Sequence, residues 1–363
     1  MPRPIVNRTP FGVHDRTDVD LWTLDSGTGV RAEILTYGGI LHGLTVPDTD
    51  GSTASVVRSL ATLDDYTGRN PFFGALIGRF ANRIAHGRFT LDGTTHHIPA
   101  NDRGHALHGG PEGFHTRIWQ ATADAGEGAA TLRLTLHSPD GDMGFPGALD
   151  VTVTYTLDTT GTLAVDYAAT TGRPTVLNLT NHAYFDLTAT GDVLGHTLQV
   201  DADTYLPVDG DGIPQGPAAD VHRTPFDLTA PRTIGERIAL PDEQLRMAGG
   251  FDHCWIVRDP GPGPGPHSAL RRAARLTAPD AARILEVWTT EPGIQVYTAN
   301  QLDGTLADPA GLRHARHSAI CLETQHLPDS PNRPDYPSTE LRPGEVARSR
   351  TEFRFPHLAP DPA

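Results

Sequence analysis

The sequence has no stretch of 18 consecutive apolar residues, and so it offers no candidate for a membrane-spanning helix. Its first residues, Met1-Pro-Arg-Pro, lead into polar sequence without the hydrophobic region of a secretion signal. Cysteine is scarce as well, because only Cys254 and Cys321 occur, and a single bridge would not make a secreted disulfide framework. We therefore expect a cytoplasmic protein without a membrane partner, and both cysteines as reduced thiols buried in strands.

Positive charge is in short supply. Lysine and arginine together number 29 against 44 aspartates and glutamates, which gives a formal net charge of −15. A chain this acidic repels phosphate backbones and anionic membrane surfaces, so we expect no nucleic acid partner. Helical patterning is thin too, and is confined to short pieces at residues 60–66 and 241–247.

Glycine and proline, by contrast, are abundant, with 38 and 31 residues. Asp-Gly pairs recur along the chain and signal tight turns. Between the turns, apolar and polar residues alternate as half-buried antiparallel strands require. These runs lie at residues 131–137, 151–157, 162–167, 284–288 and 293–298. The sequence predicts an all-β fold, a large antiparallel β-sandwich with a few short helices.

A chain of 363 residues gives a prior of two domains, although all-β sandwiches often exceed the usual domain size as single units. The Pro-Gly-rich segment at residues 258–267 resembles an interdomain linker in composition. Its position between two strand-like runs instead favours an elongated hairpin tip. We expect residues 1–363 to form one domain, acting as a monomer or a weak homodimer.

Several familiar chemical signatures are absent. The sequence contains no glycine-rich dinucleotide fingerprint, Walker A loop, Gly-x-Ser-x-Gly elbow, His-Glu-x-x-His motif or Cys-x-x-Cys pair. His105 and His108 are spaced like a metal pair, but no further ligand has suitable local spacing, so a substrate donor or a structural histidine is the favoured interpretation. We expect neither a cofactor nor a metal.

The most informative segment lies near the C-terminus. A strand-like run at residues 318–322 leads to Glu323 and Gln325, which point to one face because strand side chains alternate, while Thr324 points to the other. Prolines then exclude regular structure and favour a stiff functional loop over a disordered one. These prolines are Pro328, Pro331, Pro334, Pro337 and Pro343.

Other polar clusters interrupt apolar, strand-like sequence. Asn178, His182 and Tyr184 would share one face of a regular strand, where an isolated histidine is more often a satisfied core group than a functional one. The remaining candidates are Asn82 with Arg83, His108, Asp252 after two glycines, and Gln295. One histidine, two carboxylates, an arginine and several amides suit proton transfer on a hydroxylated, uncharged substrate, which indicates sugar chemistry.

Taken in order, these clusters resemble the aldose 1-epimerase (galactose mutarotase) family. The matching stretches are Gly78-Arg-Phe-Ala-Asn-Arg-Ile, Leu107-His-Gly-Gly, Asn178-Leu-Thr-Asn-His-Ala-Tyr-Phe, Phe251-Asp-His, Gly293-Ile-Gln-Val-Tyr and Glu323-Thr-Gln-His-Leu-Pro-Asp-Ser-Pro. The last motif, with the following Ser338-Thr-Glu-Leu-Arg-Pro-Gly-Glu, is highly specific. The resemblance implies a β-sandwich of the galactose mutarotase type and an isomerase of hexose metabolism that interconverts the anomers of free aldoses without a cofactor.

The resemblance also implies residue roles. Glu323 matches the family's general base and His182 its general acid. Positions that bind the sugar hydroxyls and ring oxygen fall on Asn82, Arg83, His108, Tyr184, Asp252 and Gln295. Two features differ from the family's usual sequence pattern. The Pro-Gly segment after Arg258 is longer than usual, and Phe251 stands where tyrosine is common. Either difference could alter the rim of the cleft.

Three alternatives stay open from the sequence. A glycosidase could use Asp252 and Glu323 as its carboxylate pair. A hexose-6-phosphate 1-epimerase on the same fold would need extra cationic groups for the phosphate. A non-catalytic sugar-binding module would be expected to lack the acid or the base, and here both positions are filled.

Overall fold

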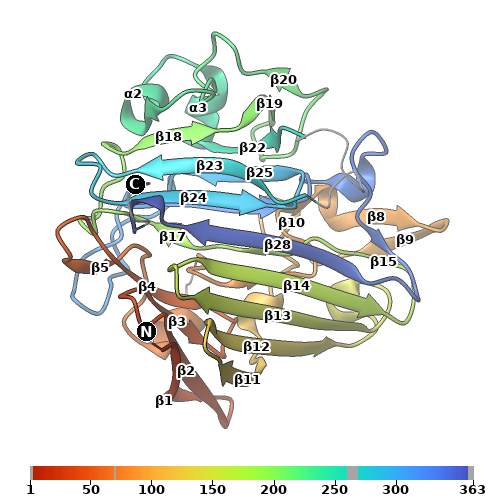
Figure 1. Ribbon diagram of the computed structural model, residues 1–363. Coiled ribbons are helices and arrows are strands. Elements are labelled where there is room, and N and C mark those ends of the chain that lie inside the picture. The colour runs from red at the N-terminus through yellow and green to blue at the C-terminus, as the bar shows by residue number, and fades with distance from the viewer. Residues whose placement is uncertain (1–2, 69–70, 260–268, 359–363) are drawn as a thin grey trace.

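The computed structural model describes residues 3–68, 71–259 and 269–358. Over these ranges the chain consists of antiparallel sheets with three short α-helices (Figure 1). The predicted all-β, antiparallel class is confirmed. None of the helices in the described ranges is long and apolar enough to cross a membrane.

The largest sheet has nine strands within the described residues, and β14 and β28 lie at its centre (Figure 1). In spatial order its strands are β11 (Gln120–Ala125), β12 (Ala129–Ser138), β13 (Leu149–Asp158), β14 (Leu163–Thr171), β28 (Ala347–Arg354), β24 (Ile284–Thr289), β23 (Arg271–Thr277), β18 (Thr197–Val200) and β21 (Arg232–Thr233). Strand β13 shows the alternation of buried and half-buried residues that the sequence predicted. Its odd-numbered residues from Val151 to Leu157 are buried, while the residues between them are only half-buried.

A second sheet, of six strands within the described residues, carries most of the polar clusters found in the sequence. Its order is β17 (Tyr184–Phe185), β26 (Ile320–Gln325), β25 (Gly293–Tyr297), β22 (Asp252–Val257), β19 (Ala202–Leu206) and β20 (Ala219–Asp220). Three of the five predicted strand runs lie within β12, β13 and β24, and the other two overlap β14 and β25. The prediction for residues 318–322 was wrong at both ends, because β26 begins at Ile320 and continues through Gln325.

The rest of the chain forms smaller sheets around these two. A five-stranded sheet from the N-terminal part comprises β1 (Ile5–His14), β2 (Thr17–Asp25), β3 (Arg31–Leu35), β4 (Leu41–Pro47) and β5 (Thr53–Ser55). The two-stranded pairs are β6 (Leu76–Ile77) with β16 (Thr180–Asn181), β7 (Arg83–Ile84) with β10 (Ala106–Leu107), β8 (Arg88–Leu91) with β9 (Thr94–His97), and β15 (Thr175–Val176) with β27 (Glu340–Leu341).

The helices are short and begin at capping residues. Helix α1 (Leu63–Thr67) starts at a capping box formed by Thr62 and Asp65, and α3 (Glu243–Ala248) starts at Asp242 and ends at Gly249 in the left-handed conformation. Both fall where the sequence predicted helical pieces. Helix α2 (Ile234–Ile238) was missed, because a single five-residue turn leaves almost no periodic signal.

Two faces of β26 have different surroundings. On one face Thr324 meets Thr351 of β28, with 2.5 Å between their hydroxyl oxygens, so this face belongs to the interior between the two large sheets. Nearby, Phe185 of β17 packs on Phe353 of β28 in the same interior. The opposite face of β26, which carries Glu323, is therefore turned away from the main core and toward the loops that join the smaller sheets.

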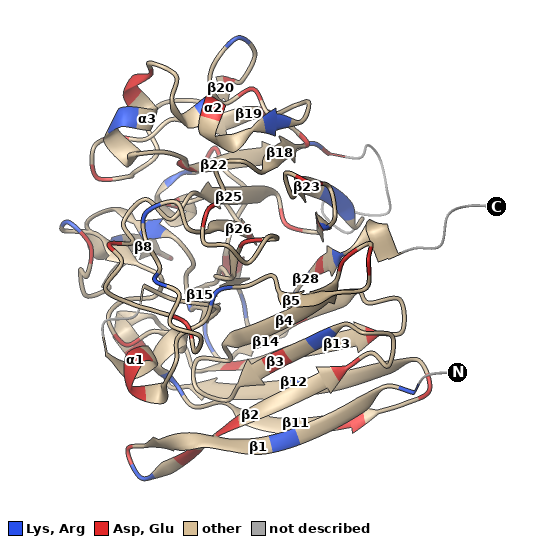
Figure 2. Cartoon of the chain, turned by 90° about the vertical axis from the view of Figure 1, so that its left-hand side faces the viewer, with Lys and Arg blue, Asp and Glu red and all other residues tan. Residues whose placement is uncertain are grey.

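Charged residues are placed mainly on loops and strand ends. Figure 2 shows acidic and basic residues interspersed there, and long strands such as β23 and β28 also carry several charged residues. The hairpin proposed for residues 258–267 lies almost wholly outside the described residues, because the description stops at Asp259 and resumes at residue 269.

Candidate active site

A cavity lies over the Glu323 face of the six-stranded sheet, and all eight residues proposed from the sequence line it. The lining residues are Pro71, Phe72, Asn82, Arg83, Leu107, His108, His182, Tyr184, Asp252, Gln295, Tyr297, Gln301 and Glu323. They come from six sections of the chain that are far apart in sequence. Strand pairing in the sheet, with the loops that cover it, brings them together.

Strand register explains how the sheet presents its part of the site. Gln295 of β25 pairs with Glu323 of β26, and in the neighbouring pair Tyr297 lies opposite Asp252 of β22. Residues opposite one another, and residues two apart on one strand, project to the same face. The register therefore places a carboxylate, an amide, a phenol and a second carboxylate on one patch.

The segment around His182 differs from the sequence prediction. A regular strand would have put Asn178, His182 and Tyr184 on one face, but the chain here is broken into the short strands β15, β16 and β17. Asn178 is turned away from the cavity. Its amide N–H donates to the carbonyl of Ala81 at 3.0 Å, and its amide oxygen accepts from the backbone N–H of His326 at 2.9 Å. Asn178 therefore holds the loops together.

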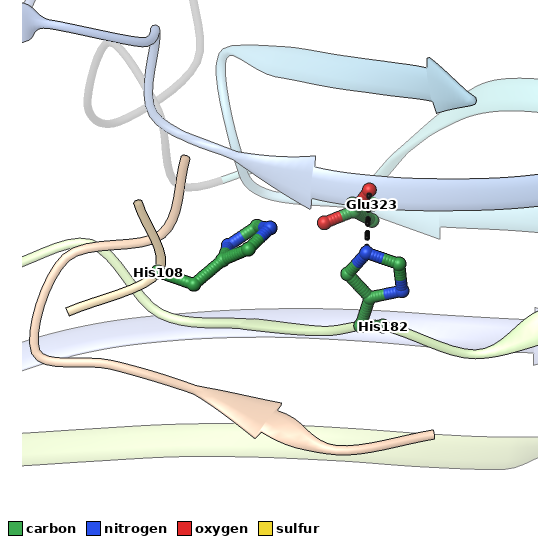
Figure 3. A group of neighbouring side chains, drawn as sticks. All are labelled: His108, His182 and Glu323. Carbon is green, nitrogen blue, oxygen red and sulfur yellow. Dashed lines mark ion pairs between the residues drawn. The ribbon is translucent and has the colours of Figure 1, made fainter. Parts of the chain in front are cut away.

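His182 and Glu323 face each other across the cavity floor. The distance from His182 Nε2 to Glu323 Oε1 is 3.7 Å, and Figure 3 shows the imidazole pointing at the carboxylate from the opposite chain segment. Both side chains are almost fully buried, at 6% and 3% exposure. The second carboxylate oxygen, Glu323 Oε2, has no hydrogen-bond partner among the described residues, which leaves it free to accept from a substrate hydroxyl.

Burial sets the electrostatics of this pair. Desolvation lowers the pKa of His182 to about 4, and the attraction of Asp252 opposes that shift only in part. Desolvation also raises the pKa of Glu323 well above its ordinary 4.5, and the like charge of Asp252 adds to the rise. Each group is thus poised toward its uncharged form, so that one proton is shared between a weak base and a weak acid.

His108 enters the cavity from the side of its own loop (Figure 3). Its Nδ1 accepts a hydrogen bond from the backbone N–H of Asn82 at 3.2 Å. Burial lowers the pKa of His108 well below its ordinary value, so the ring is neutral and its one proton must sit on Nε2. His108 consequently offers a donor to the cavity.

This tautomer bears on metal binding. The nearest ligand atoms of His108, His182 and Glu323 lie within 4.8 Å of one another, a spacing that would suit a metal ion. A metal ligand needs a bare ring nitrogen, and in His108 one nitrogen is engaged by Asn82 while the other carries the proton. The three residues therefore fit a hydrogen-bonding site better than a metal centre.

Arg83 is held in place from behind. Its Nε donates to Asp102 Oδ2 at 2.9 Å, and a Cβ at Gly212 would come within 2.9 Å of the guanidinium, so the loop at Gly212 packs closely on it. The side chain is only 6% exposed. Because Nε is used for positioning, the terminal nitrogens of the guanidinium can donate to a sugar hydroxyl in the cavity. Asp102 was not found from the sequence, since nothing local links it to Arg83.

Asp252 and Gln295 are joined by a hydrogen bond and both present acceptor oxygens. Gln295 Nε2 donates to Asp252 Oδ1 at 2.7 Å, which fixes the amide because a carboxylate can only accept. The other amide atom, Gln295 Oε1, is buried without a hydrogen-bond partner in the described part of the chain. Together the two residues offer acceptors for sugar hydroxyls.

Aromatic rings complete the walls. The Tyr184 hydroxyl donates to the carbonyl of Pro71 at 2.8 Å, so Tyr184 contributes its ring and an acceptor oxygen to the cavity. Phe72 and Tyr297 were missed. Tyr297 lies two residues after Gln295, and the period-two rule could have found it. Phe72 lies in a loop at φ 67°, where its ring packs 4.6 Å from that of His108, and no local pattern predicts it.

Three neighbouring residues lie outside the cavity. His105 Nδ1 accepts from the backbone N–H of His86 at 2.9 Å, which makes it structural. Phe251 is fully buried against Phe226 and Trp255, so its departure from the family pattern does not alter the rim. Gln325 shares the face of Glu323 as predicted, but it is fully buried and does not line the cavity.

The chain is similar to known proteins in both sequence and fold. The family model described as aldose 1-epimerase matches residues 20–354. The chain is 42% identical over 328 residues to the galactose mutarotase of Rattus norvegicus, covering 90% of this chain and 91% of that protein. It is 37% identical over 357 residues to the aldose 1-epimerase of Escherichia coli (strain K12), covering 97% and 99%. The crystal structure of a galactose 1-epimerase from Lactobacillus acidophilus superposes with a TM-score of 0.84 at 27% identity, covering 97% and 98%.

Proposed function

We propose that this chain, which belongs to the aldose 1-epimerase family, interconverts the α and β anomers of free aldoses with Glu323 as general base and His182 as general acid. It is an isomerase, and its substrates are sugars. The residue assignment rests chiefly on one observation, the 3.7 Å approach of His182 to Glu323 in a cavity lined with hydrogen-bonding groups.

The geometry suits ring opening at the anomeric carbon. The anomeric hydroxyl and the ring oxygen are bonded to the same carbon, so a base for one and an acid for the other must lie close together. Glu323 takes the hydroxyl proton while His182 protonates the ring oxygen, and the ring opens to the aldehyde. Rotation about the C1–C2 bond exposes the other carbonyl face, and the same two groups acting in reverse close the ring to the opposite anomer.

The proposed mechanism depends on how protons are distributed between His182 and Glu323. Burial favours neutral His182 with protonated Glu323, whereas the forward step needs the imidazolium and the carboxylate. The two distributions contain the same number of protons. Attraction between the opposite charges, about 4 kcal/mol at roughly 4 Å in an effective dielectric near 20, offsets much of the desolvation. Sugar hydroxyls donating to the carboxylate would favour the ionic form further.

The pH dependence follows from this shared proton. Below the acid limb both groups are protonated and no base remains; above the alkaline limb neither carries a proton to donate. We predict a bell-shaped profile of kcat/KM whose acid limb lies near pH 4, below the ordinary histidine value of 6.5, because burial lowers the pKa of His182. The alkaline limb lies above the ordinary carboxyl range, because the pKa of Glu323 is raised.

Initial rates measured by polarimetry from roughly pH 3 to roughly pH 10, a range that brackets the ordinary carboxyl and histidine pKa values on both sides, give the profile. An acid limb at the ordinary histidine pKa would contradict the low pKa of buried His182.

Asp252 is assigned to substrate orientation. Replacing Asp252 by Ala removes a charged acceptor and frees the Gln295 amide, so KM should rise about 10- to 100-fold, as loss of a hydrogen bond to a charged group predicts. The ratio of kcat/KM for galactose and glucose should change as well. Asp124→Ala on the exposed strand β11 serves as the matched control. Unchanged KM and unchanged hexose preference would remove Asp252 from the binding role.

The direct test of the activity is polarimetry on freshly dissolved α-D-glucose and α-D-galactose with and without protein. We expect the approach to the equilibrium rotation to accelerate in proportion to protein concentration. The same assay with xylose and arabinose would define the aldose range, in which galactose and glucose are the family default. No acceleration with any aldose would refute the proposal.

The rival activities are less well supported. A glycosidase would release the chromophore from a nitrophenyl glycoside, and we expect none. A phosphate-binding epimerase would need cationic groups at the cavity, but the sequence contains no lysine, and Arg83 is the only arginine among the cavity residues in the described ranges. For a sugar-binding module without catalysis, the paired acid and base have no purpose.

Several further expectations are part of the proposal. A cytoplasmic location is supported by Cys254 and Cys321, which are both free and buried. A single domain over residues 1–363 is supported by one hydrophobic cluster that joins residues from Leu24 to Phe355. We also propose a monomer or weak homodimer, which sedimentation equilibrium would test.

A further inference from the structure

The general acid has a sulfur neighbour. Cys321 Sγ lies 3.5 Å from His182 Nδ1, on the side of the imidazole opposite to Glu323. Both residues are buried, Cys321 completely, so bulk water does not compete for this contact. His182 therefore has the carboxylate of Glu323 near one ring nitrogen and a thiol near the other.

Strand β26 supplies both of these neighbours. Cys321 and Glu323 are two residues apart on β26 and so project to the same face. Cys321 pairs with Tyr184 of β17, and His182 lies two residues before Tyr184, which brings the imidazole between the thiol and the carboxylate. A single rigid strand thus fixes the base and the rear contact of the acid.

We propose that Cys321 is a positioning residue for the reaction, which holds the imidazole of His182 through Nδ1 and keeps its imidazolium form a strong acid. The inference rests on the proposed function, because it assigns Cys321 a part in the chemistry of His182. Cys321 does not line the cavity, so it acts through the histidine and not on the sugar.

The choice of a thiol matters chemically. Burial raises the pKa of Cys321 well above its ordinary value, so the sulfur stays protonated and can donate S–H to a bare Nδ1. When Nδ1 carries a proton, the same sulfur can turn and act as a weak acceptor. A carboxylate in this place would stabilise the imidazolium strongly and make it a poorer proton donor to an ether oxygen.

Other titratable groups also surround His182, and the test has to separate their effects. Glu323 lies on β26, while Asp252 and His115 act on the imidazole electrostatically. Tyr184, His108 and Tyr297 contribute rings whose centroids lie 5.0 Å, 5.3 Å and 6.4 Å from that of His182. The variants below leave all of these groups in place.

The experiment compares Cys321→Ala with Cys321→Ser. Loss of the sulfur should lower kcat about tenfold with little change in KM, as loss of an orienting partner behind a reactive group does at other sites. Serine should restore part of kcat, because its hydroxyl can also donate and accept. A hydroxyl oxygen is the better acceptor for Nδ1–H, so Cys321→Ser should also move the acid limb of kcat/KM upward by about 0.5 pH unit.

Cys254 is the matched control, because it is equally buried on β22 but its thiol approaches the carbonyl of Trp255 at 3.7 Å instead of His182. Cys254→Ala and Cys254→Ser should leave the acid limb unchanged, whatever they do to the melting temperature. A Cys321 series that retains wild-type kcat, or that loses kcat equally in both variants without moving the acid limb, would overturn the proposal.

A readout without turnover separates this inference from the proposed function. Long-range ¹H–¹⁵N spectra of the imidazole nitrogens, with His182 assigned by its loss in His182→Gln, report its tautomer and pKa. The inference predicts that Cys321→Ser and Cys321→Ala change these His182 signals while Cys254→Ser does not. Unchanged His182 signals in the Cys321 variants would refute the role of the thiol. If these signals change but the wild-type protein shows no mutarotase activity, only the proposed function is refuted.

Discussion

Replacing Glu323 by Gln should lower kcat for mutarotation by at least about a hundredfold, with KM nearly unchanged. The amide is almost the same size as the carboxylate and can still accept a hydrogen bond, but it cannot take a proton, and positioned acid-base catalysis contributes roughly 10²–10⁴-fold. Among the described residues, Glu323 is the carboxylate that contacts the His182 imidazole, at 3.7 Å. Polarimetric initial rates at several sugar concentrations give kcat and KM separately.

Glu127→Gln in the exposed turn between β11 and β12 makes the same chemical change far from the cavity and should leave both constants unchanged. Melting temperatures of the two variants would show whether the fold is intact. A Glu323→Gln protein that folds normally and turns over at near the wild-type rate would remove Glu323 from the role of base.

Replacing His182 by Gln should have an effect of similar size, a loss of roughly 10²–10⁴-fold in kcat, because the amide donates a hydrogen bond but cannot release its proton to the ring oxygen. The matched control is His137→Gln on β12, where the imidazole is 61% exposed. The alkaline limb of the pH profile should still be governed by Glu323 in any residual activity.

Because we propose that Glu323 and His182 act as a unit, we expect the double variant Glu323→Gln with His182→Gln to be slowed by much less than the product of the two single effects. Stopped-flow polarimetry or a coupled assay specific for one anomer would supply the rates. Full multiplication of the single effects would indicate that the two residues serve separate steps.

Part of this site could be read from the sequence because it follows from strand periodicity. Glu323 and Gln295 lie in strands with a clear alternation of apolar and polar residues, and every second side chain of a strand projects to the same face. Cys321 follows from the same rule, as the residue two positions before Glu323, although the sequence alone gave no reason to connect it with His182. The all-β class followed from the same alternation repeated through the chain.

What the sequence could not supply depends on contacts between distant segments. Asp102 meets Arg83, and Phe72 meets His108, only because loops fold over the sheet, and neither contact leaves a local pattern. Asn178 was placed on the wrong face, because the segment around it is divided into the short strands β15, β16 and β17 and its side chain turns into the loops. Periodicity predicts faces only as long as the strand continues.

The protonation states of the pair were beyond the sequence for a different reason. Asp252 attracts the proton of His182, and this much could be anticipated from opposite charges. Desolvation opposes it and is larger, as the lowered pKa of His182 shows, and the extent of burial becomes known only when the loops are in place. The pKa of Glu323 rises for the same reason.

A crystal structure of the Glu323→Gln variant with D-galactose bound would show directly whether the two side chains flank the anomeric centre. We expect the anomeric oxygen within about 2.6–3.2 Å of the side chain at position 323, and the ring oxygen within the same range of His182 Nε2. Galactose bound with its anomeric carbon away from this pair, or with His182 and residue 323 on the same oxygen, would contradict this expectation.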